Sequence, residues 1–121
     1  MFELTVIGKF SAAHKIDGYS GNCSRMHGHN WRVELKIAAD KLDEIDMVFD
    51  FRKAKSILNG ILEKLDHTVL NDNPILAGGN TTAERIAMII YRMVKEKVPE
   101  NIDIVSVGVW ESDNACVTYK Q

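Results

Sequence analysis

Two long stretches near the N-terminus alternate apolar and polar residues, and this alternation does most to limit what the chain can fold into. Residues 2–12 carry apolar or small side chains at even positions, and residues 31–39 carry them at odd positions. Side chains two apart along a β-strand point to the same face of a sheet. The two stretches are therefore predicted to be long strands, each with one buried face.

The period changes to three and four from about residue 51, which is typical of helices. Asp50 is suited to cap a first helix, whose inward face is predicted to carry Phe51, Ala54, Leu58, Ile61 and Leu65. Thr81 and Glu84 form a capping box that opens a second helix, which Pro99 ends. The inward face of this second helix is predicted to carry Ala83, Ile86, Ala87, Ile90 and Val94.

Two more strands are predicted at residues 102–110 and 115–119, joined by turn-forming residues 112–114. The element order is then ββααββ within a single domain that spans residues 1–121. Strands in sequential pairs favour an antiparallel four-stranded sheet with both helices packed on one face. The predicted fold class is α+β.

Composition and charge exclude several classes of protein. The chain is 45% hydrophobic and 26% charged, which rules out intrinsic disorder. A net charge of −2, without blocks of like charge, argues against nucleic-acid and membrane-surface partners. The longest apolar run, residues 86–91, is far shorter than the roughly 20 residues that span a bilayer. With only two cysteines, free thiols in a reducing cytoplasm are expected.

Three of the four histidines fall where the two long strands would bring them together. His27 and His29 are two apart and share a face, and His14 has the core-facing parity of the neighbouring strand. Three converging imidazoles make a three-nitrogen metal site, most naturally for zinc with an open fourth position. The alternative is that each ring is an ordinary surface or core residue, which is less favoured for three matched histidines than for one.

The other candidate residues each allow more than one interpretation. Cys23 is a small hydrophobe, a fourth metal ligand or a reactive thiol, and residue types alone do not separate these roles. Asp66 and His67 form either a polar helix terminus or an oriented acid–base pair. Glu111 continues the inward parity of Val105, Val107 and Val109, so it is either a solvated strand end or a buried carboxylate suited to a guanidine-like edge.

These motifs occur together, in the same order and spacing, in one known family. Residues 10–14, Cys23 with His27-Gly28-His29, residues 65–67, Thr82-x-Glu84 and Glu111 resemble the 6-pyruvoyltetrahydropterin synthase family over essentially the whole chain. The short spacing from the cysteine to His-Gly-His resembles the bacterial branch, the 6-carboxytetrahydropterin synthases of queuosine biosynthesis. Residues 110–114 look more like the animal enzymes, and position 81 is threonine, where many bacterial members carry proline before the matched Thr82.

The resemblance implies the tunnelling fold, in which ββααββ subunits assemble into a β-barrel. The usual assembly is a homohexamer, a dimer of trimers, with active sites between subunits. The resemblance also implies a role for each matched position. Zinc would be bound by His14, His27 and His29, the catalytic residues would be Cys23, Asp66 and His67, and the substrate-binding residues would be Glu111 and Thr82.

The implied activity is that of a zinc-dependent lyase. It would convert 7,8-dihydroneopterin triphosphate to 6-carboxy-5,6,7,8-tetrahydropterin, with release of acetaldehyde and triphosphate. One alternative is the same fold producing 6-pyruvoyltetrahydropterin, which keeps the side chain. The other is a non-catalytic zinc-binding module with a closed Cys-His₃ site. A structural zinc site has no need of Asp66, His67 or Glu111, so these residues count against the module.

Overall fold

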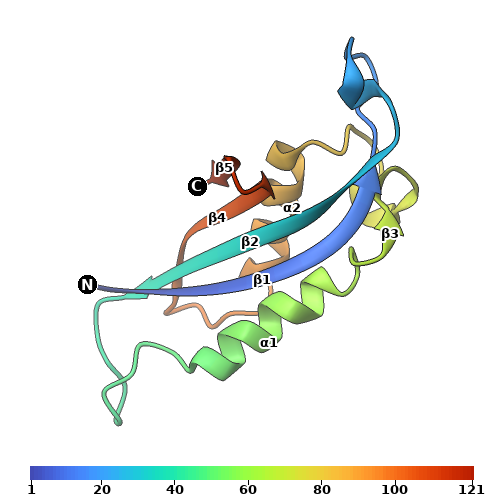
Figure 1. Ribbon diagram of the computed structural model, residues 1–121. Coiled ribbons are helices and arrows are strands. Elements are labelled where there is room, and N and C mark those ends of the chain that lie inside the picture. The colour runs from blue at the N-terminus through green and yellow to red at the C-terminus, as the bar shows by residue number, and fades with distance from the viewer.

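The two alternating stretches form the longest strands of the computed structural model, which describes residues 1–121. Strand β1 (Phe2–His14) and strand β2 (His27–Ala39) pair antiparallel along their whole length. Figure 1 shows them as two long curved arrows. The register places Phe2 opposite Ala39 and His14 opposite His27. Even positions of β1 and odd positions of β2 therefore share one face, as the alternation predicted.

The sheet has five strands in the order β3-β1-β2-β4-β5, which corrects the predicted four. Strands β4 (Asp103–Ser112) and β5 (Ala115–Tyr119) extend the antiparallel sheet beyond β2. The additional strand, β3 (Thr68–Val69), pairs parallel with Ala12 and Ala13 of β1. A two-residue strand is too short to produce an alternating pattern, so it could not be predicted from the sequence.

A bulge in β4 corrects the predicted parity of this strand. Ile37 lies opposite Ile104, but the preceding Lys36 lies opposite Ser106, so Val105 is an extra residue in β4. Val105 is consequently only half-buried, and Ser106 is buried. Beyond the bulge the predicted parity holds, because Val107 and Val109 are fully buried. Glu111 follows them on the same face.

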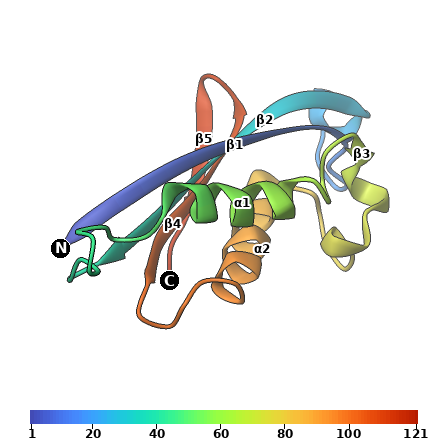
Figure 2. The same cartoon turned by 90° about the horizontal axis from the view of Figure 1, so that it is seen from below.

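Both helices cover one face of the sheet, as Figure 2 shows. Helix α1 (Phe51–Leu62) begins after Asp50, whose carboxylate accepts the Arg52 N–H at 2.8 Å, as predicted. Of its predicted inward residues, Ala54, Leu58 and Ile61 are buried, and Leu65 is buried but lies beyond the end of the helix at Leu62. Phe51 is 56% exposed, because the first residue of the helix extends past the core. The inward face therefore begins one turn later, at Ala54.

Helix α2 (Ala83–Lys95) buries all five predicted inward residues, but its capping differs from the predicted box. The N-cap is Thr82, whose hydroxyl accepts the Arg85 N–H at 3.2 Å. Thr81 cannot cap because it is buried, and its hydroxyl donates to the Lys15 carbonyl oxygen at 3.1 Å. Glu84 is therefore an exposed residue of the first turn rather than a capping partner.

A single cluster of 25 buried hydrophobic residues lies between the sheet and the two helices. The connecting segments contain three short 3₁₀ turns, at Asn22–Ser24, Leu70–Asp72 and Pro74–Leu76. The first of these lies in the segment between β1 and β2, which projects beyond the end of the sheet (Figure 1). Neither of the two α-helices has the length and hydrophobicity of a membrane-spanning helix.

Candidate metal centre and substrate pocket

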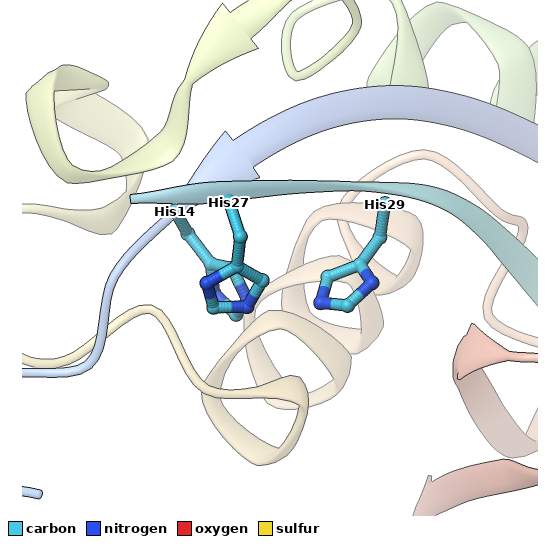
Figure 3. A group of neighbouring side chains, drawn as sticks. All are labelled: His14, His27 and His29. Carbon is cyan, nitrogen blue, oxygen red and sulfur yellow. The ribbon is translucent and has the colours of Figure 1, made fainter. Parts of the chain in front are cut away.

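Three histidine rings converge on the helix-covered face of the sheet. His14 comes from the last residue of β1, and His27 and His29 come from the start of β2. Figure 3 shows all three side chains on the same side of these strands. One ligand nitrogen from each ring lies within 4.8 Å of the others. The long antiparallel register creates this arrangement, because it places the end of β1 directly opposite the start of β2.

Hydrogen bonds orient two of the rings. The Nδ1 of His14 donates to the carbonyl oxygen of Thr81 at 2.7 Å, and the Nδ1 of His27 donates to that of Arg25 at 2.6 Å. A carbonyl oxygen can only accept, so each Nδ1 carries the proton and each Nε2 keeps its lone pair. Histidine ligands of metals are commonly fixed in this way.

The Nε2 nitrogens of two of the rings are placed as metal ligands would be. The Nε2 atoms of His14 and His29 are buried and have no hydrogen-bond partner. Buried polar atoms are nearly always paired, so two such nitrogens side by side are suited to bind a ligand. Burial also lowers the pKa of both rings below the ordinary histidine value. The rings are thus held neutral, which is the form that binds a metal ion, and the site fits zinc.

Glu111 brings a carboxylate to the edge of this centre. Its Oε1 lies 3.4 Å from the Nε2 of His14 and 3.7 Å from the Nε2 of His29. The same residue lines a cavity of about 320 Å³ together with Thr82, so the two predicted substrate residues share one pocket. Further lining residues are Ile16, Tyr19, Glu84 and Val109. A ligand in this pocket would contact the carboxylate next to the three rings.

Asp66 and His67 form a pair just after α1. His67 Nδ1 lies 2.9 Å from one oxygen of Asp66, and the other oxygen accepts the Ser11 N–H at 2.8 Å. The Ser11 bond, with the bond to His67 second, lowers the pKa of Asp66 below its ordinary value. His67 adopts a left-handed backbone (φ 56°), and its N–H donates to the Ser11 carbonyl oxygen at 2.6 Å. The pair is thus fixed to β1 by both residues.

Within one chain, this pair does not reach the three histidines' ligand group. The His67 side chain is 83% exposed and borders a different cavity of about 350 Å³. That cavity is lined by residues near the end of β1 and the start of β2, among them Ser11, Ala13 and Asn30, and also by His29 of the ligand group. The acid–base pair therefore lies outside the ligand group, and its cavity meets that group only at His29.

Cys23 is also separate from the histidines. It lies half-buried in the 3₁₀ turn between β1 and β2, where its carbonyl oxygen accepts the Ile16 N–H at 2.8 Å. The ligand group contains no cysteine, and Cys23 lines neither the pocket of Glu111 nor the cavity of His67. The structure therefore does not form the closed Cys-His₃ arrangement of a structural zinc module.

Sequence reasoning missed the residues that hold the segment after His14. The side chain of Asn71 both donates to and accepts from the main chain of Lys15, with each distance 2.9 Å. Asn80 does the same for Asp17, at 3.1 and 3.0 Å. Asparagine next to proline or glycine indicated only loops, and no local pattern shows which distant main chain such a side chain will bind.

In this α+β fold, a sheet covered by two helices holds three neutral imidazoles beside a pocket that a carboxylate lines. This arrangement is that of a small enzyme with a candidate metal centre. The chain belongs to the 6-pyruvoyl tetrahydropterin synthase family, whose model matches residues 3–121. The predicted family and the predicted enzyme class, a tetrahydropterin synthase, are confirmed.

Individual relatives agree with this membership. A protein from Archaeoglobus fulgidus is 40% identical over 117 residues, which cover 94% of either chain. The 6-carboxy-5,6,7,8-tetrahydropterin synthase of Bacillus subtilis is 36% identical over 127 residues, covering 98% of this chain and 85% of the relative. The fold matches that of the Caenorhabditis elegans 6-pyruvoyl tetrahydropterin synthase, with a TM-score of 0.87 at 24% identity, covering 99% of this chain and 95% of that one. The tunnelling fold is thereby confirmed for the subunit.

Proposed function

We propose that this protein converts 7,8-dihydroneopterin triphosphate to 6-carboxy-5,6,7,8-tetrahydropterin, with release of acetaldehyde and triphosphate, as part of queuosine biosynthesis in the cytoplasm. The observation that carries the proposal is the three-histidine group with Glu111 at its edge and a pocket behind it. The name of the Bacillus subtilis relative supports this product. Both cysteines are free, which suits a reducing compartment.

The metal is proposed to be zinc, held by His14, His27 and His29. Zinc bound there would polarise the oxygens of the substrate's side chain and make the adjacent C–H more acidic. The protein's contribution is to keep the three rings neutral and oriented. Thr81 and Arg25 fix the two Nδ1 protons that leave the Nε2 lone pairs directed into the centre.

Glu111 and Thr82 are proposed to bind the pterin ring. The 2-amino group and N3 of a pterin present two parallel N–H groups, which a carboxylate can accept together. Glu111 is two-thirds buried at the end of β4, so such a pair of bonds would be partly shielded from water. Binding there fixes which carbon of the substrate's side chain faces the histidines.

Proton transfer is assigned to Cys23 and to the Asp66–His67 pair. The Cys23 thiolate is the base that removes the acidified proton, and His67 returns a proton on the other side of the substrate. Asp66 stays ionised because its pKa is lowered, so it holds the His67 Nδ1 proton and directs Nε2 outward. Because these groups lie apart within one chain, we place the complete site between subunits.

The sheet edges support this assembly. Strand β5 has a neighbour on one side only, and β3 covers only Ala12 and Ala13 of the long outer edge of β1. Soluble proteins cover, charge or close such edges. Joining β5 of one subunit to β1 of the next would close three sheets into a barrel, and two barrels would give the proposed homohexamer.

The decisive experiment is product analysis. Zinc-loaded protein is incubated with 7,8-dihydroneopterin triphosphate, and the pterin formed is identified by mass spectrometry. The proposal expects 6-carboxytetrahydropterin and acetaldehyde in equal amounts. A pterin that keeps its three-carbon side chain would instead assign the 6-pyruvoyl activity. Unchanged substrate with fully loaded protein would contradict the enzymatic role.

A further inference from the structure

The segment between β1 and β2 carries Cys23, and little of its own main chain holds it in place. The segment spans residues 15–26 and projects beyond the end of the sheet (Figure 1), and only Ile16 and Cys23 in it are half-buried rather than exposed. Gly18 and Gly21 adopt positive φ angles of 81° and 118°, which few residues other than glycine tolerate. One main-chain hydrogen bond, from the Ile16 N–H to the Cys23 carbonyl oxygen at 2.8 Å, joins its two arms.

Two asparagine side chains hold the base of this segment from other loops. The amide of Asn71 donates to and accepts from the main chain of Lys15, with each distance 2.9 Å. The amide of Asn80 does the same for Asp17, at 3.1 and 3.0 Å. A primary amide has both a donor and an acceptor, so it binds a main chain as a neighbouring strand would. We call these two side chains, with their four hydrogen bonds, the asparagine clamp.

The clamp and the cysteine turn bind opposite edges of the same short stretch. Lys15 and Asp17 are bound by the asparagines, whereas Ile16 between them is bound to the carbonyl oxygen of Cys23. Main-chain groups of successive residues in an extended chain point to opposite edges. Any shift of the clamped residues would therefore move Ile16 and, through its hydrogen bond, the residue that carries the thiol.

The clamp also joins this segment to the loops that carry other parts of the proposed site. Asn71 lies four residues after His67, and Asn80 lies two residues before Thr82. The clamped stretch itself directly follows the metal ligand His14. Neither asparagine belongs to the three-histidine group or lines the proposed pterin pocket. The clamp can therefore affect the reaction only through the placement of the segments that it joins.

We propose that Asn71 and Asn80 are positioning residues, which hold the Cys23 thiol at one place relative to His14. This statement rests on the proposed function, in which the thiol is the base. An exposed loop could move at no cost to the hydrophobic core, so two clamps from distant parts of the sequence serve position rather than stability. The clamp thus allows a loop outside the core to supply a group to a reaction that depends on precise geometry.

Removing the clamp should slow catalysis without emptying the site. Asn71→Ala and Asn80→Ala are each expected to lower kcat by about 10-fold or more, because a displacement of about 1 Å can cost that much. Zinc content and affinity for unsubstituted pterin should stay at wild-type levels, since the histidines and Glu111 are intact. Asn22→Ala is the matched control, because it removes an exposed amide next to Cys23 in the same segment. Its kcat should equal that of wild type, and equal kcat in both clamp variants would overturn the proposal.

Hydrogen exchange checks the clamp without any turnover. The N–H groups of Lys15, Ile16 and Asp17 are all hydrogen-bonded, so peptides covering residues 15–26 should exchange faster in both clamp variants than in wild type. Peptides from α1 and α2 should exchange as in wild type. Unchanged exchange over residues 15–26 would overturn the proposal even if kcat fell. Faster exchange throughout the chain would make the clamp a requirement for folding, and would overturn the positioning role.

A double variant separates the positioning of Cys23 from any other role of the clamp. Asn80→Ala is combined with Cys23→Ala, and the remaining activity is followed in a single turnover at high enzyme concentration. If the clamp acts through the thiol, Asn80→Ala should lower the rate of Cys23→Ala by less than about two-fold, because residues that act as a unit have non-additive effects. An equally large loss with and without the thiol would show that Asn80 acts by another route, and would overturn the proposal.

Failure of this inference is distinguishable from failure of the proposed function. Product analysis of the wild-type enzyme does not depend on the asparagine clamp. A wild-type chain that converts the substrate while both clamp variants keep full kcat overturns only the inference. A wild-type chain that leaves the substrate unchanged contradicts the proposed function, and the assignment of a catalytic thiol with it.

Discussion

At the scale of single residues, the metal centre depends on where main-chain carbonyl groups lie. His14 is oriented by the carbonyl of Thr81, and the Thr81 hydroxyl in turn donates to the carbonyl of Lys15, the residue after His14. Asn71 holds the same Lys15 main chain from the other loop. His14 is thus fixed by contacts with two different loops at the end of β1, which leave its Nε2 little freedom to turn away.

Removing one imidazole should empty the metal site. We expect His27→Ala to lose stoichiometric zinc, because it removes one of the three histidine ligands. Metal analysis of the purified variant checks this. His67→Ala is the control, since His67 is not part of the ligand group and its loss should leave the zinc content unchanged. Full zinc occupancy in His27→Ala would show that the ligands are other residues.

Cys23 should be separable from metal binding. The thiol lies outside the ligand group, so Cys23→Ala is expected to keep its zinc and its oligomeric size while losing most of its turnover. Zinc content, light scattering and kcat measured on one preparation test the three parts of this prediction. Zinc that is lost together with the thiol would instead show that Cys23 is a ligand.

Glu111 should determine pterin affinity even when no metal is bound. In Glu111→Gln one acceptor oxygen becomes a donor that faces a donor, and an unpaired buried polar group costs about 1–3 kcal/mol. Binding of unsubstituted pterin to the metal-free protein should weaken by roughly 10- to 100-fold, as measured by fluorescence titration. Glu84→Gln, in the same pocket, should weaken it less. Equal affinity in wild type and Glu111→Gln would make Glu111 an ordinary strand-end residue.

The sequence alone could place the three histidines because strand parity and antiparallel pairing act over the whole length of β1 and β2. It could also place Glu111 on the inward face, since the parity of β4 holds beyond the bulge. It could not show that Glu111 approaches His14 and His29, because that contact depends on the register between β4 and β2. The sequence also could not show that Asp66 and His67 lie outside the ligand group, because their position depends on how β3 pairs with β1.

At the scale of elements, the packing of α1 against β1 depends on a position without a side chain. A Cβ on Gly8 would lie 2.7 Å from Leu62 Cδ1 and 3.0 Å from the Asn59 side-chain oxygen. Both contacts are with side chains of α1, so these side chains or the helix would have to move. The periodicity of α1 predicted which residues face inward, but how closely the helix approaches the sheet is a property of both surfaces together.

Two glycine substitutions should therefore change stability in opposite directions. Gly8→Ala should lower the free energy of unfolding by about 1–3 kcal/mol through overpacking. Gly60→Ala, on the exposed side of α1 with no atom within 4 Å of the added Cβ, should raise it by up to about 1 kcal/mol. Urea denaturation of each variant at fixed protein concentration measures both. A neutral Gly8→Ala would mean that α1 moves away from the sheet at little cost.

At the scale of the whole molecule, one chain holds every proposed part of the active site but does not bring them together. The pocket of Glu111 and the cavity that His67 borders have no lining residue in common. We propose that a second subunit brings its acid–base pair to the pocket of the first. The exposed edges of β1 and β5 offer the means of attachment. Assembly would therefore be a condition of activity as well as of solubility.

A mixing experiment tests this arrangement directly. Cys23→Ala and His67→Ala are each expected to be inactive alone. Suppose that each site takes its thiol from one subunit and its acid–base pair from another. Random co-assembly of the two variants in equal amounts then leaves both groups intact in roughly one quarter of the sites. The mixed oligomers, co-expressed and purified through two different tags, should therefore regain roughly a quarter of the wild-type kcat per site.

If both groups of a site came from the same chain, every site in the mixture would lack one of them, and no activity would return. The same result would follow if the protein were a monomer, which light scattering of the wild type would show independently. The control is to mix the two purified variants without co-expression. Because closed barrels should exchange subunits slowly, this mixture should stay inactive at first and gain activity only as subunits exchange. Activity that appears at once would point to subunits held together weakly rather than by closed sheet edges.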